Sequence, residues 1–203
     1  MDFLDKHAPI DVTHGSYLPH WEQDGNYQFV TFRLADSLPQ DRIRELKAMS
    51  DNFLKQHPKP WNRDTEISYW RIIGPIEQRL LDAGMGSCLL RSPDVRAVVS
   101  DALRHYDEVR YVVMAYVIMP NHVHLLVKGV DGYSVKETMK SVKGFTGKVI
   151  NRICQKQGVL WAESYDRQIR NEDHLKYTIN YILRNPRFLR SDEYEIYLKD
   201  WGR

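Results

Sequence analysis

Two apolar stretches separated by only two residues place the strongest constraint on how this chain can fold. Residues 109–119 read VRYVVMAYVIM and residues 122–129 read HVHLLVKG, with only Pro120 and Asn121 between them. β-Branched and aromatic residues favour strands, and a connection this short joins antiparallel neighbours. The sequence therefore predicts a β-hairpin inside an antiparallel sheet.

Patterns on either side of this hairpin predict the rest of the fold. The other expected elements, in chain order, are a strand at 27–35, a helix at 37–57, a helical insertion at 58–106, a helix at 134–155, a short strand at 164–170 and a helix at 172–184. Within the insertion we expect a helix from Pro75 to Asp82, and we expect Asn171 to cap the helix at 172–184. Without the insertion, the order is β-α-β-β-α-β followed by one more helix. We therefore expect an α+β fold of the ferredoxin-like type. It would be a single domain over residues 1–203 whose antiparallel sheet carries its core helices on one face.

The composition is that of a globular protein without a membrane span. Hydrophobic residues make up 42% and charged residues 28% of the chain, which is ordinary for a soluble domain. No apolar run reaches the roughly 18 residues that a transmembrane helix needs. The N-terminal stretch lacks the apolar segment of a signal peptide, and the two cysteines have no metal-binding spacing. These features predict a cytoplasmic protein with no membrane partner.

The charge is distributed unevenly along the chain. The formal net charge is only +2, yet residues 136–190 hold twelve Lys and Arg against five Asp and Glu. A basic C-terminal half favours a polyanionic partner, and nucleic acid is the commonest one. The alternative is a solvated helix face that acidic residues balance elsewhere in space.

His122 and His124 interrupt the most apolar part of the second strand. Successive strand residues point to opposite faces of a sheet, so the two imidazoles share one face and Val123, Leu125 and Val127 share the other. If the valines and the leucine contact the core helices, the histidines face away from them. Two imidazoles at this spacing can bind one metal ion, although a complete site needs a third ligand. The alternative is two unrelated surface histidines on an open sheet face.

The last predicted helix repeats polar residues at helical spacing. Tyr177, Tyr181 and Asn185 recur every four residues and therefore lie on one face. A buried tyrosine face is the simpler interpretation. A phenolate can, however, attack a phosphodiester when a metal polarises the phosphate. The amide oxygen of Asn185, one turn after Tyr181, could supply the ligand that His122 and His124 lack.

Several motifs together resemble one family of enzymes. They read AYVIMPNHVHLLV at 115–127, GVLWAESYDRQIRN at 158–171 and YILRNP at 181–186, and FVTFRLADSLP at 29–39 is similar to the family's first strand and turn. In this order and spacing they resemble the single-tyrosine HUH transposases, and most closely the REP-associated tyrosine transposases of bacteria.

This resemblance implies a specific site and reaction. Its metal ligands would be His122, His124 and Asn185, its ion Mg²⁺ or Mn²⁺, and its nucleophile Tyr181. The expected substrate is single-stranded DNA that forms hairpins, such as REP elements. The expected reaction is cleavage through a covalent 5′-phosphotyrosine that leaves a free 3′-hydroxyl, followed by transfer to a second strand. Some HUH enzymes use two tyrosines four residues apart, as Tyr177 and Tyr181 are, but the flanking motif resembles the single-tyrosine family.

Basic and aromatic residues in the C-terminal half could contact the DNA. Trp161 and Tyr165 could stack on bases, although Trp161 fits the core equally well. The basic residues expected to line a DNA path are Lys136, Lys140, Lys143, Lys148, Arg167, Arg170, Arg184 and Arg187. The protein would act in the bacterial cytoplasm, in association with the nucleoid, and a homodimer is left open. Two other functions also remain open: a non-catalytic nucleic-acid-binding module, and a metal-dependent hydrolase of small phosphates.

Overall fold

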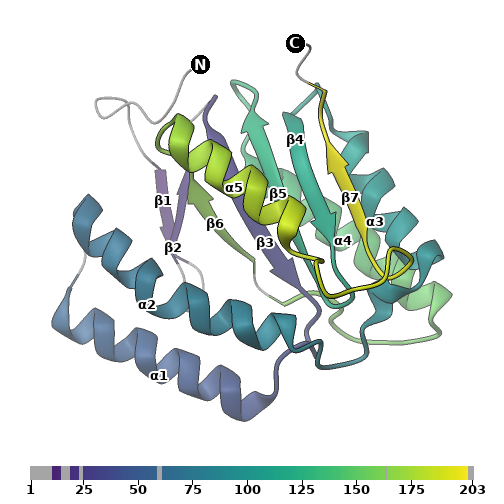
Figure 1. Ribbon diagram of the computed structural model, residues 1–203, viewed down its shortest axis with the longest axis horizontal. Coiled ribbons are helices and arrows are strands. Elements are labelled where there is room, and N and C mark those ends of the chain that lie inside the picture. The colour runs from purple at the N-terminus through teal and green to yellow at the C-terminus, as the bar shows by residue number, and fades with distance from the viewer. Residues whose placement is uncertain (1–10, 15–18, 23–24, 59–60, 163, 201–203) are drawn as a thin grey trace.

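The computed structural model describes residues 11–14, 19–22, 25–58, 61–162 and 164–200. Its centre is a five-stranded antiparallel sheet (Figure 1). In sheet order the strands are β6 (Tyr165–Gln168), β3 (Tyr27–Arg33), β5 (His122–Gly129), β4 (Tyr111–Ile118) and β7 (Glu195–Leu198). The first four have the order and direction of a ferredoxin-like sheet, so the predicted fold class is confirmed. The predicted hairpin is the β4–β5 pair.

Helices cover both faces of this sheet. On one face lie α3 (Pro93–His105) and α4 (Val135–Ile153), which pack beside each other and over the sheet. On the other face α5 (Glu172–Arg184) crosses β5 and β4, as Figure 1 shows. The core helices therefore share one face as expected, and the last helix turns the second face into a separate buried layer.

A helical hairpin extends beyond one edge of the sheet. It consists of α1 (Gln40–Gln56) and α2 (Arg63–Asp82), which pack against each other around a core of their own. Figure 1 shows this pair on the side of the sheet where β6 lies and where β1 (Asp11–His14) pairs with β2 (Pro19–Glu22). A one-turn 3-10 helix, η1 (Leu89–Arg91), precedes α3.

The structure divides the region 58–106 differently from the expected insertion. The segment outside the ferredoxin-like core is α1 with α2, and α3 is the helix that connects β3 to β4 over the sheet. The reason is the apolar stripe of α3, where Val95, Val99 and Leu103 are fully buried against the sheet. In contrast, α1 buries only Leu46, Ser50 and Phe53.

Helix α2 is also longer than the sequence predicts. The expected helix began at Pro75, whereas α2 begins at Arg63 and contains Pro75 in its interior. The Asn62 side chain caps it by accepting a hydrogen bond from the Thr65 amide at 2.9 Å. None of the helices in the described part of the chain is long and apolar enough to cross a membrane.

Candidate active site

The two histidines lie on the central strand β5, beneath α5. Val123, Leu125 and Val127 contact α3 and α4, as the alternation predicts. His122 and His124 point to the opposite face, and their ring centroids are 4.7 Å apart. That face is not open, because α5 and neighbouring side chains leave 1% of His122 and none of His124 exposed. Two unrelated surface histidines are therefore excluded.

Hydrogen bonds fix both imidazole rings. His122 Nδ1 lies 2.7 Å from Asn121 Oδ1, which can only accept, so this nitrogen carries the proton. The Asn121 amide nitrogen in turn donates to the carbonyl oxygens of Leu81 and Met85, which fixes its orientation. His124 Nδ1 lies 2.7 Å from Thr31 Oγ1 on β3. Such partners hold a ring in place and leave Nε2 of His122 with a free lone pair.

Burial keeps the two histidines neutral. It lowers the pKa of His122 from its ordinary 6.5 to about 3. It also lowers the pKa of His124 well below the ordinary value, and His122 and the Arg167 guanidinium contribute to that shift. Neutral imidazoles are the form that binds metal ions.

Tyr181 reaches the histidine pair from α5. Its hydroxyl oxygen lies 3.2 Å from His124 Nε2. Phe29 of β3 holds both rings, since its ring stacks on His124 with centroids 5.3 Å apart and meets Tyr181 edge-on at 5.9 Å. The Asn171 side chain fixes the start of the helix by accepting from the His174 amide at 2.8 Å. The structure therefore brings the predicted nucleophile to one of the predicted ligands.

Asn185 caps the C-terminal end of α5, one turn after Tyr181. Its Oδ1 is buried and accepts no hydrogen bond from any described residue, and the same is true of His122 Nε2. Buried acceptors without a donor are costly and rare in native proteins, and a bound cation would satisfy them. No cluster of three His, Cys, Asp or Glu side chains occurs within the described residues, and the buried amide oxygen of Asn185 is the candidate third ligand among them.

Tyr177 does not share this environment. It lies one turn before Tyr181 on α5, and 67% of its side chain is exposed. Tyr181 is partly buried and contacts His124 and Phe29. The geometry favours Tyr181 over Tyr177 as the nucleophile, in line with the single-tyrosine motif.

The predicted basic path is split between the two faces of the sheet. The four lysines of α4 lie on the face opposite Tyr181, where Lys143 donates to the Ala162 carbonyl at 2.8 Å and Lys140 pairs with Glu137 at 3.5 Å. Arg167 and Arg170 are on the Tyr181 side and line a cleft beside it. Arg184 ends α5 and is exposed, as is Arg187 just beyond it. The residues of this face that the sequence missed are Trp70, Arg71, Gln78 and Arg79 of α2.

Trp161 and Tyr165 are the two aromatic residues expected to stack on bases. Trp161 is 6% exposed in the main core, where its ring meets Phe32 edge-on and its Nε1 donates to Thr146 Oγ1 at 2.9 Å. It is a core residue. The side chain of Tyr165 lies outside the described part of the structure.

Comparison with known proteins relates the site-bearing segment to one family. Residues 92–185 match the family model described as "Transposase IS200 like". This segment, somewhat less than half of the chain, is therefore similar to the IS200-like transposases. The matched segment runs from the N-cap of α3 through α5 and includes His122, His124, Tyr181 and Asn185, whereas α1 and α2 precede it.

A solved structure is also similar to this chain. It is titled "Structure of the REP associates tyrosine transposase bound to a REP hairpin". The two chains are 16% identical with a TM-score of 0.41, and the similarity covers 81% of this chain and 68% of the other. The comparison with curated proteins gave no significant match.

Proposed function

We propose that this protein is a transposase that cuts and rejoins single-stranded DNA through a covalent bond to Tyr181. The observation that carries the proposal is the 3.2 Å contact between the Tyr181 hydroxyl and Nε2 of His124, within the HUH-like sequence His122-Val123-His124. A purely DNA-binding module needs neither a buried pair of neutral histidines nor a tyrosine held against them.

The chain offers a ligand set that fits a divalent cation. His122 Nε2 and Asn185 Oδ1 are buried acceptors without donors among the described residues, and His124 Nε2 is the third candidate. Together they would hold Mg²⁺ or Mn²⁺, which accept nitrogen and oxygen ligands. When bound, the ion would polarise the phosphate that is to be cleaved. The Tyr181 hydroxyl contacts the same His124 nitrogen, so it must leave that nitrogen to attack.

The cleavage step needs no nucleotide cofactor, because one phosphoester bond forms as another breaks. The Tyr181 oxygen loses its proton and forms a bond to the scissile phosphorus, while the bond from phosphorus to the 3′ oxygen breaks. The departing 3′ oxygen takes up a proton and becomes a free hydroxyl. The 5′-phosphate remains on Tyr181, so the 3′-hydroxyl of another strand can reverse the step and join new ends. From the motif resemblance, we propose hairpin-forming, REP-like DNA as the substrate.

The test is the formation of a covalent protein–DNA adduct. The protein is incubated with labelled single-stranded DNA that contains a REP-like hairpin with unpaired flanks, in Mg²⁺ or Mn²⁺, and is run on a denaturing gel. We expect an adduct that chelator and Tyr181→Phe abolish and that Tyr177→Phe, the matched control on the same helix, leaves intact. Loss of the adduct in Tyr177→Phe alone would assign the nucleophile to the other tyrosine. Tight binding without any adduct would favour the binding module.

A further inference from the structure

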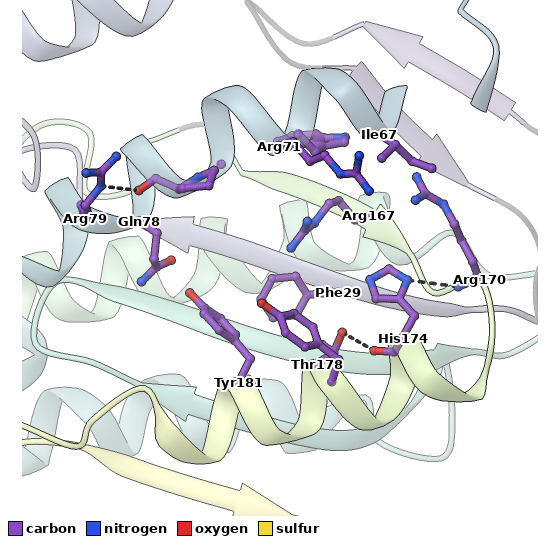
Figure 2. A pocket seen from close by; sticks show the side chains of 14 residues that line it. Phe29, Ile67, Arg71, Gln78, Arg79, Arg167, Arg170, His174, Thr178 and Tyr181 are labelled. Carbon is purple, nitrogen blue, oxygen red and sulfur yellow. Dashed lines mark hydrogen bonds between the residues drawn. The ribbon is translucent and has the colours of Figure 1, made fainter. Parts of the chain in front are cut away.

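A cleft opens beside Tyr181 between α2, β6 and α5. Its volume is about 490 Å³, within the range of roughly 300 to 1,000 Å³ that is usual for small-ligand sites. Figure 2 shows α2 and α5 as its two walls, with Tyr181 in one wall and Phe29 at the base. The α2 wall precedes the segment that matches the IS200-like family.

The cleft is lined by positively charged side chains. Four arginines line it: Arg71 and Arg79 of α2, Arg167 of β6, and Arg170. Its described lining contains no carboxylate. Within the described residues Arg71, Arg79 and Arg167 have no ion pair, whereas the exposed Arg42 pairs with Glu45 at 2.8 Å. Concentrated, unpaired guanidinium groups in a concave site favour an anionic ligand.

Three of the four arginines gather at one end of the cleft, and Arg79 lies at the other end, as Figure 2 shows. In Figure 2 Arg71, Arg167 and Arg170 lie near His174, where α5 begins, and Tyr181 lies further along the helix. The positive field there is also visible in the pKa of His174, which burial lowers to about 4 with a further contribution from Arg167 and Arg170. An anionic group bound at this end would lie within the same cleft as the nucleophile.

Aromatic rings give the cleft flat, apolar surfaces. The Arg167 guanidinium lies over Phe29 at 5.6 Å and over Trp70 at 5.7 Å, so both rings hold it in place. Its Nε is buried without an acceptor among the described residues. Tyr177 also lines the cleft and is 67% exposed, although it takes no part in the histidine site. Exposed aromatic rings beside guanidinium groups are the usual platform for unpaired nucleotides.

We propose that this cleft binds an unpaired nucleotide of the DNA strand next to the phosphate that Tyr181 attacks. Arg71 and Arg79 contact the strand's phosphates, and Tyr177 stacks on the base. The inference rests on the proposed function, because that function places the scissile phosphate at Tyr181. The cleft accommodates a nucleotide and is too small for a duplex, so it selects single strands. The α1–α2 hairpin thereby contributes a wall of the substrate site.

The proposal is tested by measuring DNA binding under conditions in which no cleavage occurs. The probes are a fluorescein-labelled pool of random single-stranded DNA, about 12 nucleotides long, and a blunt duplex of the same length, both in EDTA. Fluorescence anisotropy gives the Kd over a series of salt concentrations. The variant is Arg71→Ala/Arg79→Ala, and the matched control is Arg42→Ala/Arg44→Ala, which removes two exposed arginines from α1.

We expect the α2 variant to bind the single strand at least about tenfold more weakly. Its salt dependence should also fall by about 1.4 log units per log unit of salt, because each phosphate contact contributes roughly 0.7. The control should change less than about twofold. Equal affinity in variant and control would overturn the proposal, and so would an equal loss of duplex and single-strand binding.

Two further pairs of variants test the cleft without removing charge. A Cβ at Gly74 meets no atom within 4 Å, so Gly74→Phe should fill the cleft and weaken binding, whereas Gly74→Ala should not. Tyr177→Ala should weaken binding about fivefold or more, and Tyr177→Phe should preserve it. Unchanged binding in both Gly74→Phe and Tyr177→Ala would refute the assignment of this cleft.

The proposal and the proposed function can fail separately. If the wild type forms the Tyr181 adduct while the cleft variants bind and react normally, the cleft assignment alone is wrong. If no adduct forms but the cleft variants lose single-strand affinity, the cleft remains a nucleotide site and the proposed chemistry is wrong.

Discussion

Replacing Thr31 by valine removes the hydrogen bond that orients His124 and changes almost nothing else. Thr31 is 2% exposed, and its hydroxyl lies 2.7 Å from His124 Nδ1. Valine has nearly the same shape, so no cavity forms. The imidazole nitrogen, however, remains buried without a partner, which costs about 1 to 3 kcal/mol of folding free energy. We expect a loss of that size in denaturant unfolding.

The same variant should impair the reaction more than its stability suggests. Without the Thr31 hydroxyl, His124 Nδ1 loses the hydrogen bond that orients the ring and its Nε2, the atom that faces Tyr181. Loss of such a supporting hydrogen bond typically lowers metal affinity or activity by about 10- to 100-fold. The measurement is the rate of adduct formation, at a temperature where the variant is fully folded.

A matched control separates this effect from the loss of a buried hydroxyl. Thr138 of α4 is also 2% exposed, and its hydroxyl donates to the Ser134 carbonyl at 2.9 Å. That carbonyl still accepts from the Thr138 amide at 3.1 Å when the hydroxyl is gone. Thr138→Val should therefore cost less than about 1 kcal/mol and leave the adduct rate unchanged. A wild-type rate in Thr31→Val would refute the role assigned to His124.

Three further predictions concern the site and its surroundings. Asn185→Ala should weaken Mn²⁺ binding at least about tenfold by calorimetry, and unchanged affinity would remove Asn185 from the ligand set. Tyr181→Phe should bind Mn²⁺ no more weakly than the wild type, since the hydroxyl on His124 Nε2 competes with the ion; weaker binding would contradict that competition. Burial raises the pKa of Glu77 from 4.5 to about 7 against the smaller opposing effect of Arg33, so the folded chain keeps a proton that the unfolded chain releases. The contribution of Glu77 to stability should fall by about 3 kcal/mol as pH rises from 4.5 to 7; Glu77→Gln should flatten the dependence of the unfolding midpoint on pH, and parallel curves would contradict this reasoning.

The sequence predicted those parts of the fold that depend on local pattern. The hairpin of β4 and β5 follows from two β-branched runs and a two-residue connection. The start of α5 follows from Asn171, whose side chain caps the helix as expected. Strand alternation also placed His122 and His124 on the face opposite α3 and α4.

The errors arose where packing overrides local pattern. Proline is favoured in the first turn of a helix, so the sequence predicted a helix start at Pro75, although α2 continues through it. The short strands β1 and β7 lack a strong strand pattern, and β7 is defined by its pairing with β4. The expected DNA path combined α4 lysines with arginines near α5 because both are basic, but the sheet separates them.

The cleft could not have been found from sequence alone. Arg71 and Arg79 line the same cleft as Arg167 only because α2 faces β6 and α5 across it, a tertiary arrangement that no local spacing encodes. A helical pattern extended across Pro75 would have put Arg71 and Arg79 on one face, eight residues apart. Such a pattern would have shown that the two arginines share a face of the helix, but not which strand or helix lies opposite that face.

The most direct test of the account is the chemical identity of the protein–DNA linkage. Trypsin should release residues 177–184, YTINYILR, which contain both tyrosines, and fragmentation in the mass spectrometer locates the bound nucleotide. We predict a nucleotide attached through its 5′-phosphate to Tyr181, with release of the upstream DNA fragment as a 3′-hydroxyl. A linkage at Tyr177, a 3′-phosphotyrosine, or cleavage without any linkage would contradict the account.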